Sequence, residues 1–163
     1  MSRVSHRFMI VAFVIAAVFA IPTMLRADNL IQAAETNRTG KSTIMRIRVQ
    51  ANGQDVTFAL NESRAAMDLV AQLPLEIAVE NYGGIEKIFY PPRKLDTTVT
   101  PLAENVTAGL LAYYAPWGNV VMFFDDFRPA DGLYELGRVH EGGAMIENLS
   151  GTIRVEEVNV PDN

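Results

Sequence analysis

The sequence of 163 residues contains no cysteine and only two histidines. Without cysteine no disulfide can form, so the fold has to be stabilised by burial alone. His6 lies in an N-terminal apolar segment, which leaves His140 for the rest of the chain. A single histidine is enough for a Ser-His-Asp triad, which stays possible. It excludes a zinc site with two or more histidine ligands. His140 lies where a predicted strand ends in a turn, which favours an exposed turn residue, and we predict no metal site and no cofactor.

Basic residues are also scarce, with 14 Lys and Arg against 19 Asp and Glu and no run of basic residues. Three of them, Arg3, Arg7 and Arg26, belong to the N-terminal segment. Without that segment 14 − 3 = 11 basic residues remain against 19 acidic ones, a net charge of −8. Such a surface repels the phosphates of nucleic acids and anionic lipids. We therefore expect no nucleic-acid partner.

Residues 1–27 have the pattern of an export signal. Basic residues precede a predominantly apolar run over residues 8–25. Small residues suit cleavage after Ala27, or less well after Ala20. Pro22 interrupts the apolar run, which also favours a cleaved signal. The alternative is an uncleaved membrane anchor, because roughly 18 apolar residues are just long enough to span a bilayer. We expect a periplasmic or secreted domain, or one anchored to the membrane by the apolar run if cleavage fails.

After the signal we predict a polar linker over residues 28–42, one domain over residues 43–158 and a tail over residues 159–163. The linker contains GKS at residues 40–42, the end of a phosphate-binding loop motif. That motif also needs an earlier glycine, where this chain has Glu35, and a preceding buried strand, which is missing. We therefore predict no nucleotide site.

The domain is dominated by short segments that alternate apolar and polar residues or end at turn signals. An apolar stripe at three- and four-residue spacing predicts one helix over residues 62–73, capped by Asn61 and ended by Pro74. A short second helix is predicted over residues 144–149. Strands are predicted over residues 43–50, 56–60, 75–82, 85–90, 109–115, 120–127, 133–139 and 151–158. This pattern predicts a mainly β fold, a closed or nearly closed eight-stranded antiparallel barrel with one or two helices.

Aromatic side chains are concentrated in YYAPWGNVVMFFDDF, residues 113–127. Adjacent strand residues point to opposite faces, so we expect roughly half of these rings to be core. Trp117, at a turn, is expected to be an exposed contact residue. Asp125 and Asp126 are poor candidates for hydrolysis, because adjacent carboxylates on a strand cannot easily flank one bond.

The segment GRVHEGGAMIENL, residues 137–149, resembles the Gly-basic-Val-x-x-Gly-x-x-x-(Val/Ile) segment of cyclophilins. The order of NGQDVTFALNESRAAMDLVAQLPLEI, GGIEKIFYPPRKL, GLLAYYAPWGNVVMFF and LYELGRV is more specifically similar to the small bacterial cyclophilin-like domains. This similarity spans residues 43–158 and implies a compact cyclophilin-like barrel of eight strands.

The resemblance also implies which residues a proline-isomerase site would need, and this chain lacks several of them. Phe89 is present, but no arginine follows it directly, and Arg93 comes only after two prolines. The Trp and His expected in and after the RPADG segment are missing. We therefore expect a non-catalytic module that binds a peptide or small ligand in a groove on the barrel. Its candidate contacts are Phe89, Arg93, Tyr113, Trp117 and Phe123.

The alternative function is a peptidyl-prolyl isomerase with a rearranged site. Isomerisation needs no nucleophile or metal, only a pocket that binds the twisted amide best, often with a cationic donor. Such a site requires an arginine within reach of an aromatic pocket, whereas a binding module does not. The candidate donors are Arg46, Arg48, Arg93, Arg128 and Arg138, and the candidate aromatic partners are Phe89, Tyr113 and Phe123.

Overall fold

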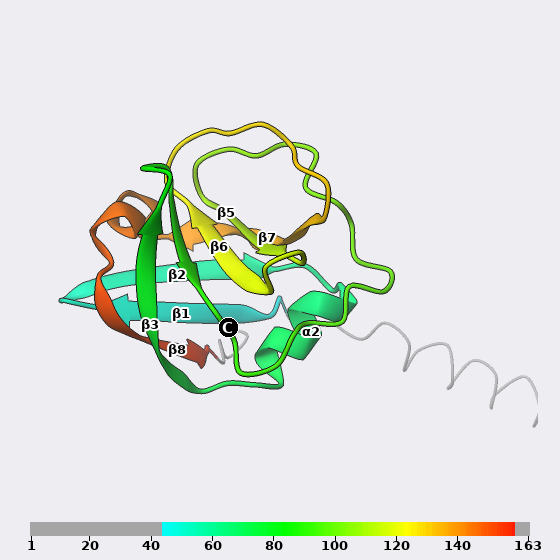
Figure 1. Cartoon of the computed structure of the whole chain (residues 1–163). Coiled ribbons are helices and arrows are strands. Elements are labelled where there is room, and N and C mark those ends of the chain that lie inside the picture. Colours follow the sequence, from blue (N-terminus) through cyan, green and yellow to red (C-terminus); the bar gives the residue numbers. More distant parts are fainter. Residues whose placement is uncertain (1–43, 159–163) are drawn as a thin grey trace, which may run out of the picture. The chain divides into compact units, whose positions relative to one another are not determined.

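A computed structural model of the chain describes residues 44–158. The predicted signal, linker and tail lie outside the described residues. Eight antiparallel strands close into a barrel in the order β1-β2-β7-β5-β6-β4-β3-β8, and β8 pairs again with β1 (Figure 1). The predicted eight-stranded antiparallel barrel is confirmed. The strands are β1 (Arg46–Ala51), β2 (Gln54–Leu60), β3 (Leu75–Tyr82), β4 (Glu86–Phe89), β5 (Leu110–Tyr114), β6 (Asn119–Phe123), β7 (Leu133–Glu141) and β8 (Gly151–Glu157).

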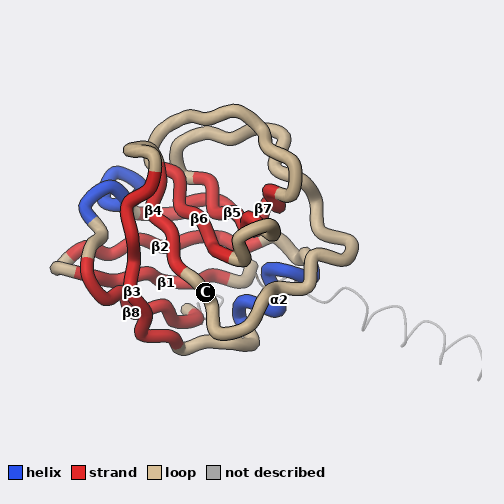
Figure 2. The backbone as a smooth tube through the Cα atoms, in the orientation of Figure 1, coloured by secondary structure: helices blue, strands red, loops and turns tan. Residues whose placement is uncertain are grey.

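Two short helices close opposite ends of the barrel, α2 (Arg64–Val70) and the 3-10 helix η1 (Gly143–Asn148) (Figure 2). Leu69 of α2 and Ile146 of η1 are fully buried in the same core as the inward residues of the strands. Within residues 44–158 neither helix is long or apolar enough to cross a membrane.

The helix predicted over residues 62–73 is shorter in the structure, and its N-cap lies two residues further along the chain. The Ser63 hydroxyl, not Asn61, accepts a hydrogen bond from the Ala66 amide at 3.3 Å. The Asn61 amide group instead donates to the Glu135 carbonyl of β7 at 2.8 Å. Because this tertiary bond holds Asn61 against the barrel, the helix begins after the next residue that can cap it.

Strand β6 also ends earlier than predicted, at Phe123, and residues 124–132 form a loop. In this loop the Phe127 amide donates to the Val106 carbonyl at 2.9 Å, so the loop pairs with another loop and not with a strand. Asp125 and Asp126 therefore lie in this loop, not on a strand. The Asp126 carboxylate accepts from the Ala108 amide at 3.0 Å, which gives it a structural role.

Side chains of alternate strand residues form two separate cores. The main core fills the barrel and includes Tyr113 and Phe89. A second core lies on the outer face of β4, β6 and β5, where Val121 and Phe123 pack against Val106 of the loop over residues 90–109. This loop and the loop over residues 124–132 run side by side above the outer face (Figure 2). The outer face is thus partly covered by loops and not by a helix.

The close approach of β7 to β2 depends on Gly137. A Cβ atom at Gly137 would lie 2.2 Å from the Ala59 carbonyl oxygen, which is a backbone atom of the barrel wall. We predict that Gly137→Ala lowers the free energy of unfolding by about 3 kcal/mol, because neither strand can move without breaking the ladder. Gly143→Ala is the control, since its Cβ would meet the Val139 side chain at 3.4 Å. Equal urea midpoints for the two variants would contradict this account.

Candidate functional site

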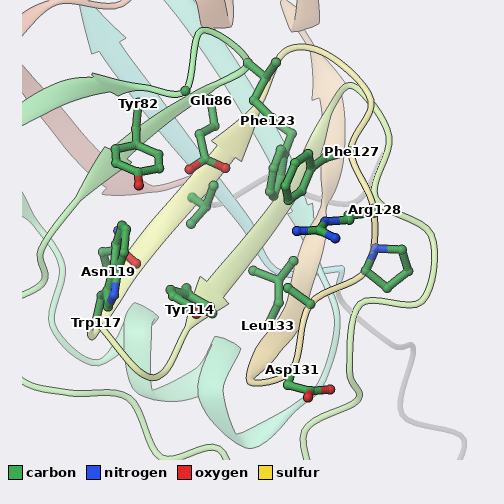
Figure 3. Close-up of a pocket in the computed structure, with 15 residues that line it drawn as sticks. Tyr82, Glu86, Tyr114, Trp117, Asn119, Phe123, Phe127, Arg128, Asp131 and Leu133 are labelled. Carbon is green, nitrogen blue, oxygen red and sulfur yellow. The ribbon is translucent and has the colours of Figure 1, made fainter.

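A pocket of about 520 Å³ opens on the outer face of the barrel, between the β3–β4 hairpin and the loop over residues 124–132 (Figure 3). Its volume falls within the roughly 300–1,000 Å³ that is usual for small-ligand sites. It lies beside the second core, at the part of the outer face that the two loops leave open.

The strand register determines which side chains form the floor of the pocket. Tyr82 of β3 pairs with Glu86 of β4, which pairs with Phe123 of β6. Further along, Asn119 of β6 pairs with Tyr114 of β5. Directly paired residues of antiparallel strands point to the same face, so each row projects into the pocket together.

Aromatic rings form two groups around the pocket (Figure 3). Trp117 packs edge to face against Tyr82, with ring centroids 5.1 Å apart, and against Tyr114, with centroids 5.4 Å apart. Phe123 and Phe127 stack at 6.4 Å with 16° between their planes. Tyr82, Trp117 and Phe127 keep 46%, 47% and 45% of their surface exposed, so large apolar faces are available to a ligand.

Charged side chains of both signs, Glu86, Asp131 and Arg128, line the pocket without ion-pair partners among residues 44–158. Glu86 is half-buried between Tyr82 and Phe123, and its removal from water raises the pKa of its carboxyl group. Arg128 is exposed, and the central carbon of its guanidinium lies 5.9 Å from the centre of the Phe127 ring. In Figure 3 Glu86 points into the pocket from the strand side and Arg128 from the loop side.

Asn119 is the buried polar residue of the site, with 1% of its surface exposed. Its side-chain oxygen has no hydrogen-bond partner among the described residues. An unpaired buried acceptor of this kind is uncommon, because its desolvation is not compensated.

Of the five predicted contact residues, the structure brings Trp117 and Phe123 into the pocket. Phe89 and Tyr113 are enclosed in the barrel, where the Tyr113 hydroxyl accepts from the Leu95 amide at 3.1 Å. Arg93 lies away from the pocket and pairs with Asp68 of α2 at 3.3 Å.

The candidate arginine donors are also separated. Arg128 lines the pocket. Arg48 pairs with Asp55 at 3.5 Å, and Arg138 pairs with Glu135 at 3.3 Å. Arg46 lies on β1, which does not contribute to the pocket. The requirement for an arginine beside an aromatic pocket is therefore met by Arg128 and by no other of these five.

Sequence reasoning missed Tyr82, Glu86, Asn119 and Phe127 as pocket residues. Tyr82 and Glu86 flank the Gly83-Gly84 turn, a position typical of exposed hairpin ends, and only the pairing of β4 with β6 brings them to Phe123. The sequence predicts Phe127 on a strand, whereas in the structure it lies in a loop that brings its ring against Phe123 in the pocket. Among residues 44–158 no three acidic or histidine side chains are placed to hold a metal ion.

A family model described as the cyclophilin-like family matches residues 49–157. The chain belongs to the cyclophilin-like family. A solved structure, that of a hypothetical protein from Archaeoglobus fulgidus, superposes with a TM-score of 0.58 at 21% identity. The match covers 72% of this chain and 98% of the solved chain, and at this identity it shows a shared fold. No curated protein matches the chain.

The two adjacent tyrosines of this cyclophilin-like barrel have different roles, which substitution can separate. We predict that Tyr113→Phe lowers the free energy of unfolding by about 1–3 kcal/mol, because the buried Leu95 amide loses its acceptor. Tyr114→Phe is the matched control and should change it by less than about 0.5 kcal/mol, because Tyr114 is partly exposed. Urea denaturation measures both. If Tyr114→Phe costs more than Tyr113→Phe, the assignment of the two faces is wrong.

Glu86 gives the domain a pH-dependent stability of defined sign. Desolvation raises the pKa of Glu86 in the folded state, so the folded protein holds the proton more tightly than the unfolded chain. Its contribution to stability is present at low pH and is lost as the pH rises through the folded-state pKa. Glu86→Gln should therefore be more stable than wild type at pH 7, with the difference disappearing in acid.

Denaturation of both proteins across the acidic range measures this difference. Glu80→Gln, which replaces an exposed carboxylate of β3, is the control for loss of charge alone. A Glu86→Gln variant that is less stable than wild type at pH 7 would show that Glu86 has a favourable partner in the folded state.

Proposed function

We propose that this protein is an exported cyclophilin-like domain that binds a peptide or small ligand in the outer pocket without catalysing a reaction. The observation that carries the proposal is the preformed pocket of about 520 Å³, in which exposed aromatic faces surround unpaired polar groups. Concave sites with mostly apolar walls and a few convergent polar groups are the usual form of ligand sites. Exposed aromatic rings that line a hollow are typical binding contacts.

Location outside the cytoplasm is part of the proposal. It is supported by the basic start and the apolar run of residues 8–25. If this segment is retained, it provides the contact with a membrane. The excess of acidic residues supports a partner other than nucleic acid.

A second candidate function, peptidyl-prolyl isomerase, is favoured by Arg128 alone. Its guanidinium lies over the Phe127 ring, 5.9 Å from its centre, so a cationic donor and an aromatic surface do meet in this pocket. Catalysis of bond rotation needs a donor that is oriented and shielded from water, because charge interactions weaken in a high dielectric. Arg128 is exposed, which favours binding over catalysis.

Two assays on residues 28–163, which contain the whole barrel, test the proposal. Trp117 is the single tryptophan, so its fluorescence reports directly on the pocket during titration with a panel of Xaa-Pro and proline-free peptides. We expect saturable changes in fluorescence, and Phe127→Ala should weaken binding by about tenfold. In a protease-coupled assay the same peptides should isomerise at the uncatalysed rate.

Acceleration of isomerisation that is lost in Arg128→Ala, but retained in the control Arg93→Ala, would establish the isomerase function instead. Failure of every peptide to change the fluorescence or to protect the pocket amides in NMR titrations would contradict a peptide-binding role.

A further inference from the structure

The pocket is lined by charged side chains of both signs that form no ion pair within residues 44–158, the carboxylates of Glu86 and Asp131 and the guanidinium of Arg128, and this limits the ligands that it can take. Glu86 projects from the start of β4, and Arg128 from the loop over residues 124–132. No ion pair joins Glu86 or Arg128 to each other or to another residue in the described part of the chain. The inference below rests on the proposed binding function and concerns the chemical class of the ligand.

Glu86 is the better buried of the two charges. Its neighbours across the strands, Tyr82 and Phe123, are both aromatic and neither offers a cation. A carboxylate that is partly removed from water is stabilised by a cation with N–H donors, since a charge-assisted hydrogen bond replaces the lost hydration. The exposed face of Tyr82 adds a surface that attracts an ammonium group. This wall of the pocket therefore favours an ammonium.

Arg128 provides the complementary wall. Its guanidinium lies over Phe127, which holds the planar donor group at the rim of the pocket. The second carboxylate of the pocket, Asp131, forms no ion pair with Arg128. The guanidinium is therefore available to a carboxylate, for which its paired N–H donors are suited.

The floor between the two charges is apolar. Phe123, Val121 and Leu133 belong to the second core and line the pocket. An aliphatic chain lying on these side chains would be removed from water, which contributes about 0.8 kcal/mol for each buried CH₂ group. A ligand with a charge at each end and methylene groups between them matches all three surfaces.

We propose that the pocket selects a bipolar ligand, with a primary ammonium bound at Glu86, a carboxylate bound at Arg128 and an aliphatic segment on Phe123, Val121 and Leu133. Free ω-amino acids and the lysine side chain of a peptide with a nearby carboxylate have this chemistry.

A matched series of four probes tests the proposal on residues 28–163. The probes are 6-aminohexanoate, hexylamine, hexanoate and 1-hexanol, which share a six-carbon chain and differ in their charged ends. Affinities are measured by Trp117 fluorescence and by NMR shifts of amides around the pocket. Shorter and longer ω-amino acids, 4-aminobutyrate and 8-aminooctanoate, determine the spacing of the two charges. We expect an ω-amino acid to bind more tightly than any probe with one charge or none.

Substitutions then assign each end of the ligand. Glu86→Gln should weaken hexylamine by about tenfold and leave hexanoate unchanged. Arg128→Gln should weaken hexanoate by about threefold, a smaller effect because Arg128 is exposed, and should not weaken hexylamine. Glu80→Gln and Arg93→Gln remove the same charges away from the pocket, so they should change neither affinity.

The outcomes separate this inference from the proposed function. If 1-hexanol and peptides bind in the pocket as tightly as the ω-amino acids, the pocket binds ligands but the selectivity for a bipolar ligand is refuted. Equal losses of hexylamine and hexanoate affinity in Glu86→Gln would also refute it. If no probe or peptide shifts the pocket amides, the binding function itself fails and the inference falls with it.

Discussion

Closure of the sheet is the constraint on which the rest of this structure depends. The strand β8 pairs with both β1 and β3, so the ring of eight strands has no free edge. An eight-stranded barrel of this kind has an interior just wide enough for its own side chains. Phe58, Phe89 and Tyr113 fill it here and are at most 1% exposed. Because the inside is occupied and α2 and η1 cover its ends, a ligand has to bind on the outside of the wall.

The outer pocket exists because loops, and not a helix, cover the outer face of β4, β6 and β5. Val106 from one loop completes a small second core with Val121 and Phe123. The cover stops short of the β3–β4 hairpin, where Glu86 and the rings of Tyr82 and Trp117 stay partly open to water. An exposed aromatic ring contributes less to stability than a buried one. A pocket that keeps several rings exposed is therefore more typical of a binding surface than of a surface with only a structural role.

Much of the fold could be predicted from the sequence, because its signals are local. Asn52 and Gly53 both adopt positive φ angles, 51° and 74°, and form the predicted β1–β2 hairpin. The opposite orientation of Tyr113 and Tyr114 follows from strand alternation, but which ring faces inward is decided by pairing with β6 and β7. The site was harder to predict, because its residues meet only through contacts between distant parts of the chain. Glu86 reaches Phe123 only through the β4–β6 register, and Phe127 only through the path of a loop.

The most direct test of a filled barrel with an outer pocket uses the absence of cysteine, since a single introduced thiol reports on one position. Val120 points into the barrel and is fully buried, whereas Tyr114 lines the pocket. Under native conditions a thiol reagent should modify Tyr114→Cys rapidly and Val120→Cys only after unfolding. Equal reaction rates for the two thiols in the folded protein would contradict the account, because they would mean that the interior is open to small molecules.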